Sequence, residues 1–353
     1  MHNLSDMQSA MLTEIRLQKS FLKAPTIETI YFGGGTPSLL AAKDIGALLD
    51  AISQYYAVSN EAEITLEANP DDITPQKVAE WQALGINRLS IGVQSFYDED
   101  LSWMNRSHNA AQSAECIQVA QNAGLTNISM DLIFGSETTT TAMWSGNLDK
   151  AIALDIYHLS CYGLTIEPNT ALAHHIQQGT KVATTDQLQA EQFVLTTKKL
   201  QEAGFAHYEI SNYAREEKYA RHNTNYWRQA PYLGIGPSAH SFDGDHRYWN
   251  VAHNPKYIQA LQDNSIPSEQ EVLSTYDKFN ECIMTGLRTM WGCSKARLQA
   301  MVPDWSDLLS KELDQLTASG ELLSVDNHLR LSPSGKLRAD SIMSKLFLTA
   351  DVV

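Results

Sequence analysis

Three consecutive glycines, Gly33 to Gly35, separate the strand-like run IETIYF from a helix-like run, LLAAKDIGALLDAI, and Thr36 follows them. Glycine allows positive φ angles and lets a ligand approach the main chain closely. The Thr36 hydroxyl adds a donor and an acceptor. No Gly-Lys-Ser/Thr follows, so this is not a Walker loop. The turn indicates a site for a small polar group, although glycine-rich turns also occur as purely structural features.

Polar side chains at other predicted strand ends strengthen this interpretation. Glu67, Gln94 and Asp131 each stand near the end of an apolar run, and Arg106 follows the third run in WMNRSHN. Arginine pairs with a carboxylate through two parallel hydrogen bonds, and carboxylates or amides bind ribose hydroxyls. A ligand with an ammonium, a carboxylate and a ribose would use this set. The alternative for Asp131 is a strand-end carboxylate that caps a helix or a turn.

The elements that must position these residues alternate along the chain. Six apolar runs, most of them followed by a helical pattern, are TIYF, EITLEANP, RLSIGVQS, NISMDLIFG, IYHLSCYGLTIEP and HYEISNYA. Strands that alternate with helices predict a parallel sheet or barrel. In β/α barrels the ligand site lies at the carboxyl ends of the strands. We therefore expect the polar strand ends to form one binding mouth.

The pattern changes after about residue 250. Two helical stretches precede GELLSVDNHLRLSPSG, which predicts a hairpin with an Asp-Asn turn. Helices followed by a short hairpin resemble a winged-helix unit. We predict a barrel over residues 1–215, a connecting segment over 216–265 and a small, mainly helical domain over 266–353, with the boundary near residues 262–272.

Composition limits the classes of function. The chain has 353 residues and a net charge of −15, which disfavours binding to nucleic acid. It contains no long apolar span and no signal peptide, so we expect a cytoplasmic protein. The four cysteines, Cys116, Cys161, Cys282 and Cys293, show neither a metal-binding nor a disulfide spacing. Separate, unreactive thiols are the simplest interpretation of the four.

Several motifs together resemble one family. YFGGGTPSLL, LEANP, RLSIGVQSF, NRSH, SMDLIFG, HYEISNYA and HNTNYW occur in this order, and the chain is similar to radical S-adenosylmethionine proteins of the HemN/HemW group over nearly its whole length. The resemblance implies α/β architecture, with a partial TIM-type barrel that lacks its first strand and a winged-helix-like C-terminal domain. HNTNYW resembles the HNxxYW signature of the haem chaperone branch.

The resemblance also implies roles for individual residues. In S-adenosylmethionine, the methionyl amino group would lie against Gly34, Gly35 and Thr36. Glu67 would orient the amino-acid end, and Arg106 would pair with its carboxylate. The ribose would contact Gln94 and Asp131, and the adenine would lie near Ile133 and Phe134.

One feature of the family has no counterpart in this sequence. Family members carry a CxxxCxxC motif whose thiolates hold a 4Fe-4S cluster, whereas no cysteine precedes Cys116. We expect the sequence to begin inside the helix after that motif, through an N-terminal truncation or a wrongly assigned start. A missing barrel strand removes about 5–10 kcal/mol of apolar burial, comparable to a whole net stability, and predicts an unstable or aggregation-prone chain.

His222 is the candidate haem ligand, because a neutral imidazole binds haem iron and Tyr226, Trp227 and Tyr232 could stack on a porphyrin. Taken from the residues alone, a histidine that hydrogen-bonds a loop, with the aromatic residues packed on the barrel, is the favoured interpretation. The resemblance favours a haem chaperone that passes haem to an acceptor apo-haemoprotein, for which a membrane-associated respiratory protein is one candidate. The alternatives are an oxygen-independent coproporphyrinogen III dehydrogenase and an inactive homologue without a cluster.

Overall fold

The computed structural model describes residues 4–23, 26–168 and 170–349. The chain divides into two compact units. Unit 1 comprises Met1–Ile30, Ala41–Ala62 and Arg221–Val353, and unit 2 comprises Tyr31–Leu40 and Glu63–Ala220. The polar strand ends singled out above therefore belong to unit 2, and His222 belongs to unit 1.

A seven-stranded sheet with the order β1-β2-β3-β4-β5-β7-β6 carries the strand ends. Its strands are β1 (Ile27–Phe32), β2 (Val58–Ala68), β3 (Arg88–Gln94), β4 (Ile128–Phe134), β5 (His158–Gly163), β6 (Ala206–Glu209) and β7 (Asn212–Ala214). The pairs β2–β3, β3–β4 and β4–β5 are parallel. The predicted α/β class is confirmed: helices line a curved parallel sheet that forms a half-barrel.

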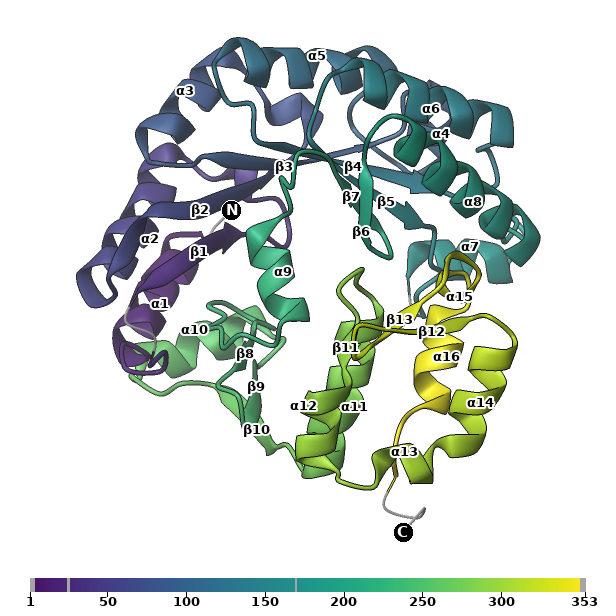
Figure 1. Ribbon diagram of the computed structural model, residues 1–353. Coiled ribbons are helices and arrows are strands. Elements are labelled where there is room, and N and C mark those ends of the chain that lie inside the picture. Colours follow the sequence, from purple (N-terminus) through teal and green to yellow (C-terminus); the bar gives the residue numbers. More distant parts are fainter. Residues whose placement is uncertain (1–3, 24–25, 169, 350–353) are drawn as a thin grey trace. The chain divides into compact units, whose positions relative to one another are not determined.

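Unit 2 supplies the helices around this sheet. They are α3 (Pro75–Ala83), α4 (Asp98–Trp103), α5 (Ala110–Asn122), α6 (Thr141–Ala153), α7 (Ala171–Gln177) and α8 (Asp186–Glu202), with the 3₁₀ turns η1 (Pro37–Leu39) and η2 (Pro70–Asp72). Helices α3, α5, α6 and α8 lie along the outer side of β2 to β5 (Figure 1). Helix α5 begins with a capping box formed by Asn109 and Gln112.

The two faces of the sheet differ in polarity. The face under the helices is aliphatic and buried, with Leu66, Leu89, Ile91, Val93, Met130, Leu132 and Leu159. Side chains alternate along a strand, so the inner face carries the residues between them: Glu63, Thr65, Glu67, Arg88, Ser90, Ser129, Asp131, His158 and Ser160. Strand register places Glu67 beside Ser90 and Asp131 beside Ser160. The inner face is therefore polar although most of these side chains are buried.

The prediction that HYEISNYA forms a single strand of the parallel sheet was wrong. It folds as β6 and β7, which pair with each other in antiparallel fashion, and β7 also runs antiparallel to β5. The cause is a tight turn held by Glu209, whose carboxylate accepts from the Ser211 amide at 3.0 Å and from Asn212 Nδ2 at 2.6 Å.

Unit 1 is built mainly from helices and two small sheets. Its helices are α1 (Leu4–Leu17), α2 (Ala42–Tyr55), α9 (Arg221–Trp227), α10 (Asn254–Gln262), α11 (Thr275–Leu287), α12 (Lys295–Met301), α13 (Trp305–Leu308), α14 (Ser310–Ala318), α15 (Pro333–Lys336) and α16 (Ala339–Lys345). Its separate sheets are β10-β9-β8 and β11-β13-β12, from β8 (His240–Phe242), β9 (His246–Asn250), β10 (Ser268–Val272), β11 (Cys293–Ser294), β12 (Leu322–Val325) and β13 (His328–Leu331).

The predicted C-terminal hairpin is present. Strands β12 and β13 pair in antiparallel fashion across Asp326 and Asn327, whose φ angles are 48° and 62°. Positive φ at both central residues is the requirement of a type I′ turn. Within the stretch predicted as a domain boundary, Ser268–Val272 forms β10 and pairs with β9. The three domain ranges stay predictions.

A buried carboxylate holds the N-terminal helix in unit 1. Glu14 of α1 is fully buried; its Oε2 accepts from the Gly236 amide at 2.9 Å and from the Tyr257 hydroxyl, and its Oε1 accepts from Asn250 Nδ2 at 2.7 Å. A buried charge is tolerated only when hydrogen bonds replace its hydration. Nothing in the helical pattern of the sequence marks Glu14 as internal. The first three residues of the predicted N-terminal helix lie outside the described residues.

Candidate functional site

One carboxylate ties the glycine turn to the end of β2. Glu67 accepts a hydrogen bond from the Gly34 amide at 2.9 Å through Oε2, and another from the Tyr31 hydroxyl at 2.8 Å through Oε1. Burial, and then the negative charge of Glu67, raise the pKa of Tyr31, so its hydroxyl remains a donor. Each carboxylate oxygen has more than one acceptor position, so Glu67 can hold the turn and accept from a ligand ammonium group as well.

The three glycines serve two different purposes. A Cβ on Gly33 would stand 2.5 Å from a ring carbon of Tyr31, so packing excludes a side chain there. Gly34 and Gly35 have φ angles of 78° and 63°, and a Cβ on either would meet nothing within 4 Å. Their main chain is exposed and faces open space, as close approach of a ligand requires. Thr36 is the N-cap residue before η1, and its side chain makes no capping hydrogen bond.

Arg106 lies beside the ends of β2 and β3. Its Nη2 donates to Asn69 Oδ1 at 2.8 Å and to the Gly92 carbonyl at 3.2 Å. Its Nε is buried without a hydrogen-bond partner, and no carboxylate of the described residues lies within 4 Å of the guanidinium. Burial lowers the pKa of Arg106, only partly opposed by the charge of Asp71. This half-satisfied guanidinium suits an external carboxylate.

A distortion at the end of β3 sets the direction of Gln94. The register of β3 and β4 shifts between Ile91 and Gln94, and Gln94 has a φ of 66°. Such a conformation costs a non-glycine residue free energy and is concentrated at functional sites. β-Bulges next to active sites redirect a side chain in this way. Here the amide Nε2 of Gln94 lies 2.8 Å from the position a Gly92 Cβ would take, so Gly92 leaves room for it.

Asp131 lies on the inner face of β4. Ser90 Oγ donates to its Oδ2 at 3.3 Å. Burial raises the pKa of Asp131 to about 6, against the lowering effect of hydrogen bonding to Ser160 and of the charge of Arg88. A carboxylate desolvated in this way gains from a hydroxyl donor, and ribose hydroxyls are such donors.

The two residues predicted near the adenine lie on opposite faces of β4. Ile133 shares the inner face with Asp131 and is partly exposed. The ring of Phe134 is buried against Trp144, with ring centroids 5.3 Å apart. A contact between Phe134 and a ligand on the inner face would therefore involve its main chain, while its ring belongs to the core under the helices.

Three further residues contribute to this region and were not predicted. Tyr31 and Asn69 orient Glu67 and Arg106 directly. His108 is buried, and its Nε2 lies 3.0 Å from the Val93 carbonyl, which fixes the end of β3 beside the bulge. Burial lowers the pKa of His108, so it acts as a neutral donor. Asn69 and His108 stand inside LEANP and NRSH, and those motifs were the signal that could have revealed them.

His222 lies in the first turn of α9, in unit 1. Its Nδ1 is 2.8 Å from Thr29 Oγ1 and its Nε2 is 3.0 Å from the Tyr226 hydroxyl. Tyr226 meets His222 edge to face, and Tyr232 packs on Tyr226 in the same manner at 4.6 Å. Arg221 anchors the start of the helix to Glu28 at 2.7 Å. Both ring nitrogens of His222 are therefore engaged, and the aromatic cluster is partly exposed.

The cysteines do not form an iron–sulfur site. Burial raises the pKa of Cys116 to about 12 and raises that of Cys161 still further, so neither is a ready thiolate. Among the described residues, no group of three or more His, Cys, Asp or Glu side chains is arranged to hold a metal ion. This part of the chain provides no ligand set for a cluster.

Comparison with known proteins places the chain. The family model "Radical SAM superfamily" matches residues 12–144. The "Heme chaperone HemW" of Mycobacterium tuberculosis (strain H37Rv) is 32% identical over 338 residues, which cover 96% of this chain and 85% of the relative. The "Heme chaperone HemW" of Escherichia coli (strain K12) is 32% identical over 342 residues, covering 96% and 88%. The chain belongs to the HemW family of radical SAM proteins.

The fold agrees with this family. Coproporphyrinogen III oxidase (HemN) from Escherichia coli, a radical SAM enzyme, superposes with a TM-score of 0.84 at 21% identity, over 98% of this chain and 83% of that one. Membership in the HemW family implies S-adenosylmethionine and a 4Fe-4S cluster as cofactors. The open glycine main chain and the unpartnered Nε of Arg106 fit the amino-acid end of S-adenosylmethionine. The cluster finds no such fit among the described residues. No described helix has the length and apolar character of a membrane span.

Proposed function

We propose that this protein is a haem chaperone, which binds haem and passes it to an acceptor apo-haemoprotein, on a scaffold that holds S-adenosylmethionine. The observation that carries the proposal is identity of about a third with proteins named heme chaperone over most of both chains. The geometry of unit 2 supports the S-adenosylmethionine part, and the surroundings of His222 support the haem part.

In unit 2 the candidate residues divide the ligand between them. The Gly34 and Gly35 main chain, Thr36 and Glu67 would take the amino group, and Arg106 would take the carboxylate through its free Nε edge. Gln94, redirected by its bulge, and Asp131 would take the ribose hydroxyls. Ile133 and the main chain of Phe134 would flank the adenine. S-Adenosylmethionine supplies, when bound, a sulfonium flanked by methionyl and adenosyl groups.

In unit 1, His222 is prepared to bind iron through one nitrogen. If its Nδ1–H donates to Thr29 Oγ1, the lone pair lies on Nε2, where the Tyr226 hydroxyl donates to it. A second-sphere bond of this kind fixes the tautomer and orientation of a ligating histidine. Haem binding would replace the Tyr226 hydroxyl by iron, while the partly exposed rings of Tyr226 and Tyr232 offer apolar contact to the porphyrin.

A haem titration of the reduced protein tests the proposal. We expect a Soret band that saturates at one haem per chain and weakens in His222→Ala. His174→Ala is the matched control, because His174 is exposed on α7 and would capture haem only by non-specific contact. If His222→Ala bound haem with the same affinity and gave a Soret band of the same intensity as the wild type, His222 would not be the haem ligand. Absence of saturable haem binding in every form would remove the chaperone function.

Transfer and turnover separate the chaperone from its alternative. Haem-loaded protein mixed with an apo-b-type cytochrome should lose its Soret band as the band of the holo-cytochrome appears. Anaerobic incubation with coproporphyrinogen III and a reductant should give no protoporphyrinogen. Product formation without haem transfer would favour the oxidoreductase instead.

A further inference from the structure

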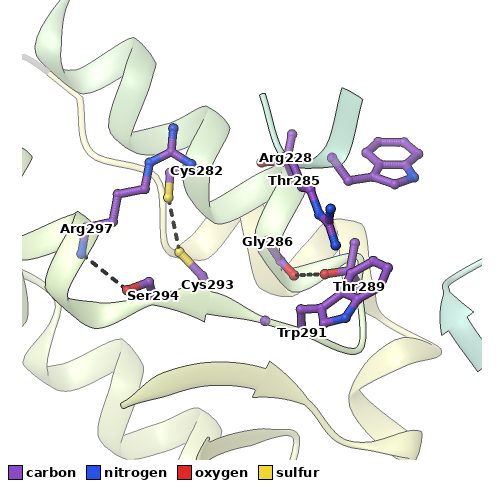
Figure 2. Close-up of a pocket in the computed structure, with 11 residues that line it drawn as sticks. Arg228, Cys282, Thr285, Gly286, Thr289, Trp291, Cys293, Ser294 and Arg297 are labelled. Atoms are coloured by element: carbon purple, nitrogen blue, oxygen red, sulfur yellow. Dashed lines mark hydrogen bonds between the residues drawn. The ribbon is translucent and has the colours of Figure 1, made fainter. Parts of the chain in front are cut away.

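Two of the four cysteines face each other in unit 1. Cys282 lies in α11 and Cys293 begins β11, and their sulfur atoms are 3.4 Å apart (Figure 2). Their side chains are buried, with exposed fractions of 3% and 1%. A disulfide has sulfur atoms about 2.05 Å apart, so a shift of about 1.4 Å would join the two. The sequence, with ten residues between them, gives no sign of this pairing.

Glycines create the close approach. A Cβ on Gly286, one turn after Cys282, would stand 2.8 Å from both Cα and Cβ of Cys293. Gly292 has a φ of 78°, and a Cβ on it would stand 2.4 Å from the Leu329 carbonyl. A side chain at Gly286 would push α11 away from Cys293, and a side chain at Gly292 would push the chain before Cys293 away from β13. Gly286 therefore permits the two thiols to meet, and Gly292 lets the start of β11 pack on β13.

The thiols line a cavity of about 180 Å³. Its walls come from the end of α9, from α11 and from the β11 segment, and include Trp227, Arg228, Thr289, Trp291 and Arg297 (Figure 2). A water molecule occupies about 30 Å³ in the liquid, so the cavity admits a small solute of the size of hydrogen peroxide. The indole Nε1 of Trp227 is buried there without a hydrogen-bond partner.

Charge decides which chemistry suits this pair. Arg297 and Arg228 line the same cavity, and Arg228 lies over the Trp291 ring at 5.3 Å. Two guanidinium groups oppose binding of a metal cation and favour a thiolate. Hydrogen bonding from Cys293 lowers the pKa of Cys282 against the effect of burial, and the charge of Arg297 favours the thiolate of both residues. Cys282 is also the more exposed of the two, at 3% against 1%, so we assign it as the nucleophile and Cys293 as the thiol that resolves the product.

We propose that Cys282 and Cys293 form a modification site at which a hydroperoxide produces a reversible disulfide. The Cys282 thiolate attacks one peroxide oxygen, the O–O bond breaks, and sulfenic acid and hydroxide form. The Cys293 sulfur then attacks the Cys282 sulfur, and hydroxide leaves and takes up the Cys293 proton as water. In sum, two thiols and hydrogen peroxide give one disulfide and two waters. A small dithiol reductant reverses the reaction by exchange.

The other two cysteines are internal controls. Cys116 and Cys161 are buried, and neither has a thiol within hydrogen-bonding distance in the described structure. Burial raises the pKa of both. The proposal thus predicts selectivity within one chain.

Thiol counting on the full-length, reduced protein tests the site. A modest excess of hydrogen peroxide should lower the free thiols, counted after denaturation, from four per chain to two, and dithiothreitol should restore four. Intact mass should fall by two hydrogens, and peptide mapping should join Cys282 to Cys293. Cys116→Ser should go from three thiols to one. In urea the same treatment should lose selectivity.

Variants assign the two roles. In Cys293→Ser a sulfenic acid should accumulate at Cys282 and react with dimedone, and Cys282→Ser should react at least tenfold more slowly. Arg297→Gln should slow disulfide formation by about tenfold, because a neighbouring positive charge lowers a thiol pKa by about one unit or more. The wild-type measurement stands without any variant. Retention of four thiols, loss spread evenly over all cysteines, or oxygen addition without a crosslink would each overturn the proposal.

Discussion

Replacement of Arg106 by Gln should weaken S-adenosylmethionine binding without unfolding the protein. The Arg106 guanidinium donates two hydrogen bonds to neutral acceptors, at 2.8 Å to Asn69 Oδ1 and at 3.2 Å to the Gly92 carbonyl. Its Nε has no hydrogen-bond partner. Burial already disfavours its charge, as its lowered pKa shows. Loss of those two bonds is therefore partly offset by relief of desolvation, and we expect the free energy of unfolding to change by about 1 kcal/mol or less.

The binding loss follows from the same geometry. A ligand carboxylate at the open edge would gain charge-assisted hydrogen bonds worth about 1.5–3 kcal/mol each. Loss of about 2–4 kcal/mol corresponds to a Kd about 30-fold to 1000-fold higher. Arg106→Lys keeps the charge but lacks the planar fork, so its loss should be smaller, about tenfold. Arg215→Gln is the matched control, because Arg215 is paired with Asp155 in the same unit.

Calorimetry with two ligands isolates the carboxylate contact. S-Adenosylhomocysteine carries the amino-acid group and 5′-methylthioadenosine lacks it. Arg106→Gln should weaken the first by the factor above and leave the second unchanged. Equal weakening of both ligands, or of neither, would show that Arg106 does not recognise the carboxylate, while Arg215→Gln reports any general damage.

Three further predictions concern the other sites. Because burial raises the pKa of Asp131 from 3.8 to about 6, the folded protein holds this proton more tightly than the unfolded chain does. The free energy of unfolding should therefore decline as pH rises from about 4 to 6 and level off above pH 6. The denaturant midpoints of Asp131→Asn should lack this decline, and a pH profile identical to that of the wild type would contradict the role of Asp131. Glu14→Gln should lower the free energy of unfolding by about 2–4 kcal/mol, because the amide presents a donor to Asn250 or to the Gly236 amide; a wild-type urea midpoint would show that Glu14 is not an anchor. Tyr226→Phe should bind haem about fivefold more tightly. In the wild type, iron must replace the hydrogen bond between the Tyr226 hydroxyl and Nε2 of His222, which costs about 1 kcal/mol, and the variant lacks this bond. Weaker binding would mean that the hydroxyl contacts haem.

Local patterns predicted the parts of the fold that depend on local physics. Alternation of apolar runs and helical stretches gave the parallel strands β2 to β5, and the Asp-Asn pair at residues 326 and 327 gave the hairpin turn. The polar residues at strand ends gave Glu67, which does contact Gly34. These features follow from periodicity, from turn chemistry and from the common edge at which parallel strands end.

Features that depend on contacts distant in sequence were not accessible. Glu14 meets partners more than 220 positions away, and its helix shows no sign of them. Cys282 and Cys293 seemed unrelated because the packing of α11 on β11 at Gly286, not a spacing rule, brings them together. The division of HYEISNYA into two strands depends on the side chain of Glu209, which a run of apolar and polar letters does not reveal.

The inner face of the half-barrel shows how one proton connects these observations. Glu209 accepts from Asn212 Nδ2, because a carboxylate cannot donate, and so Asn212 turns its Oδ1 toward Ser160, which donates to it at 3.0 Å. Ser160 has one hydroxyl proton and also lies beside Asp131. While that proton points to Asn212, Asp131 keeps the hydrogen bond from Ser90 at 3.3 Å, and burial is the main cause of its raised pKa. A ribose hydroxyl supplied by a ligand would add a further donor to the Asp131 carboxylate, so affinity for an adenosyl ligand should rise as pH increases through about 6, in the opposite sense to stability.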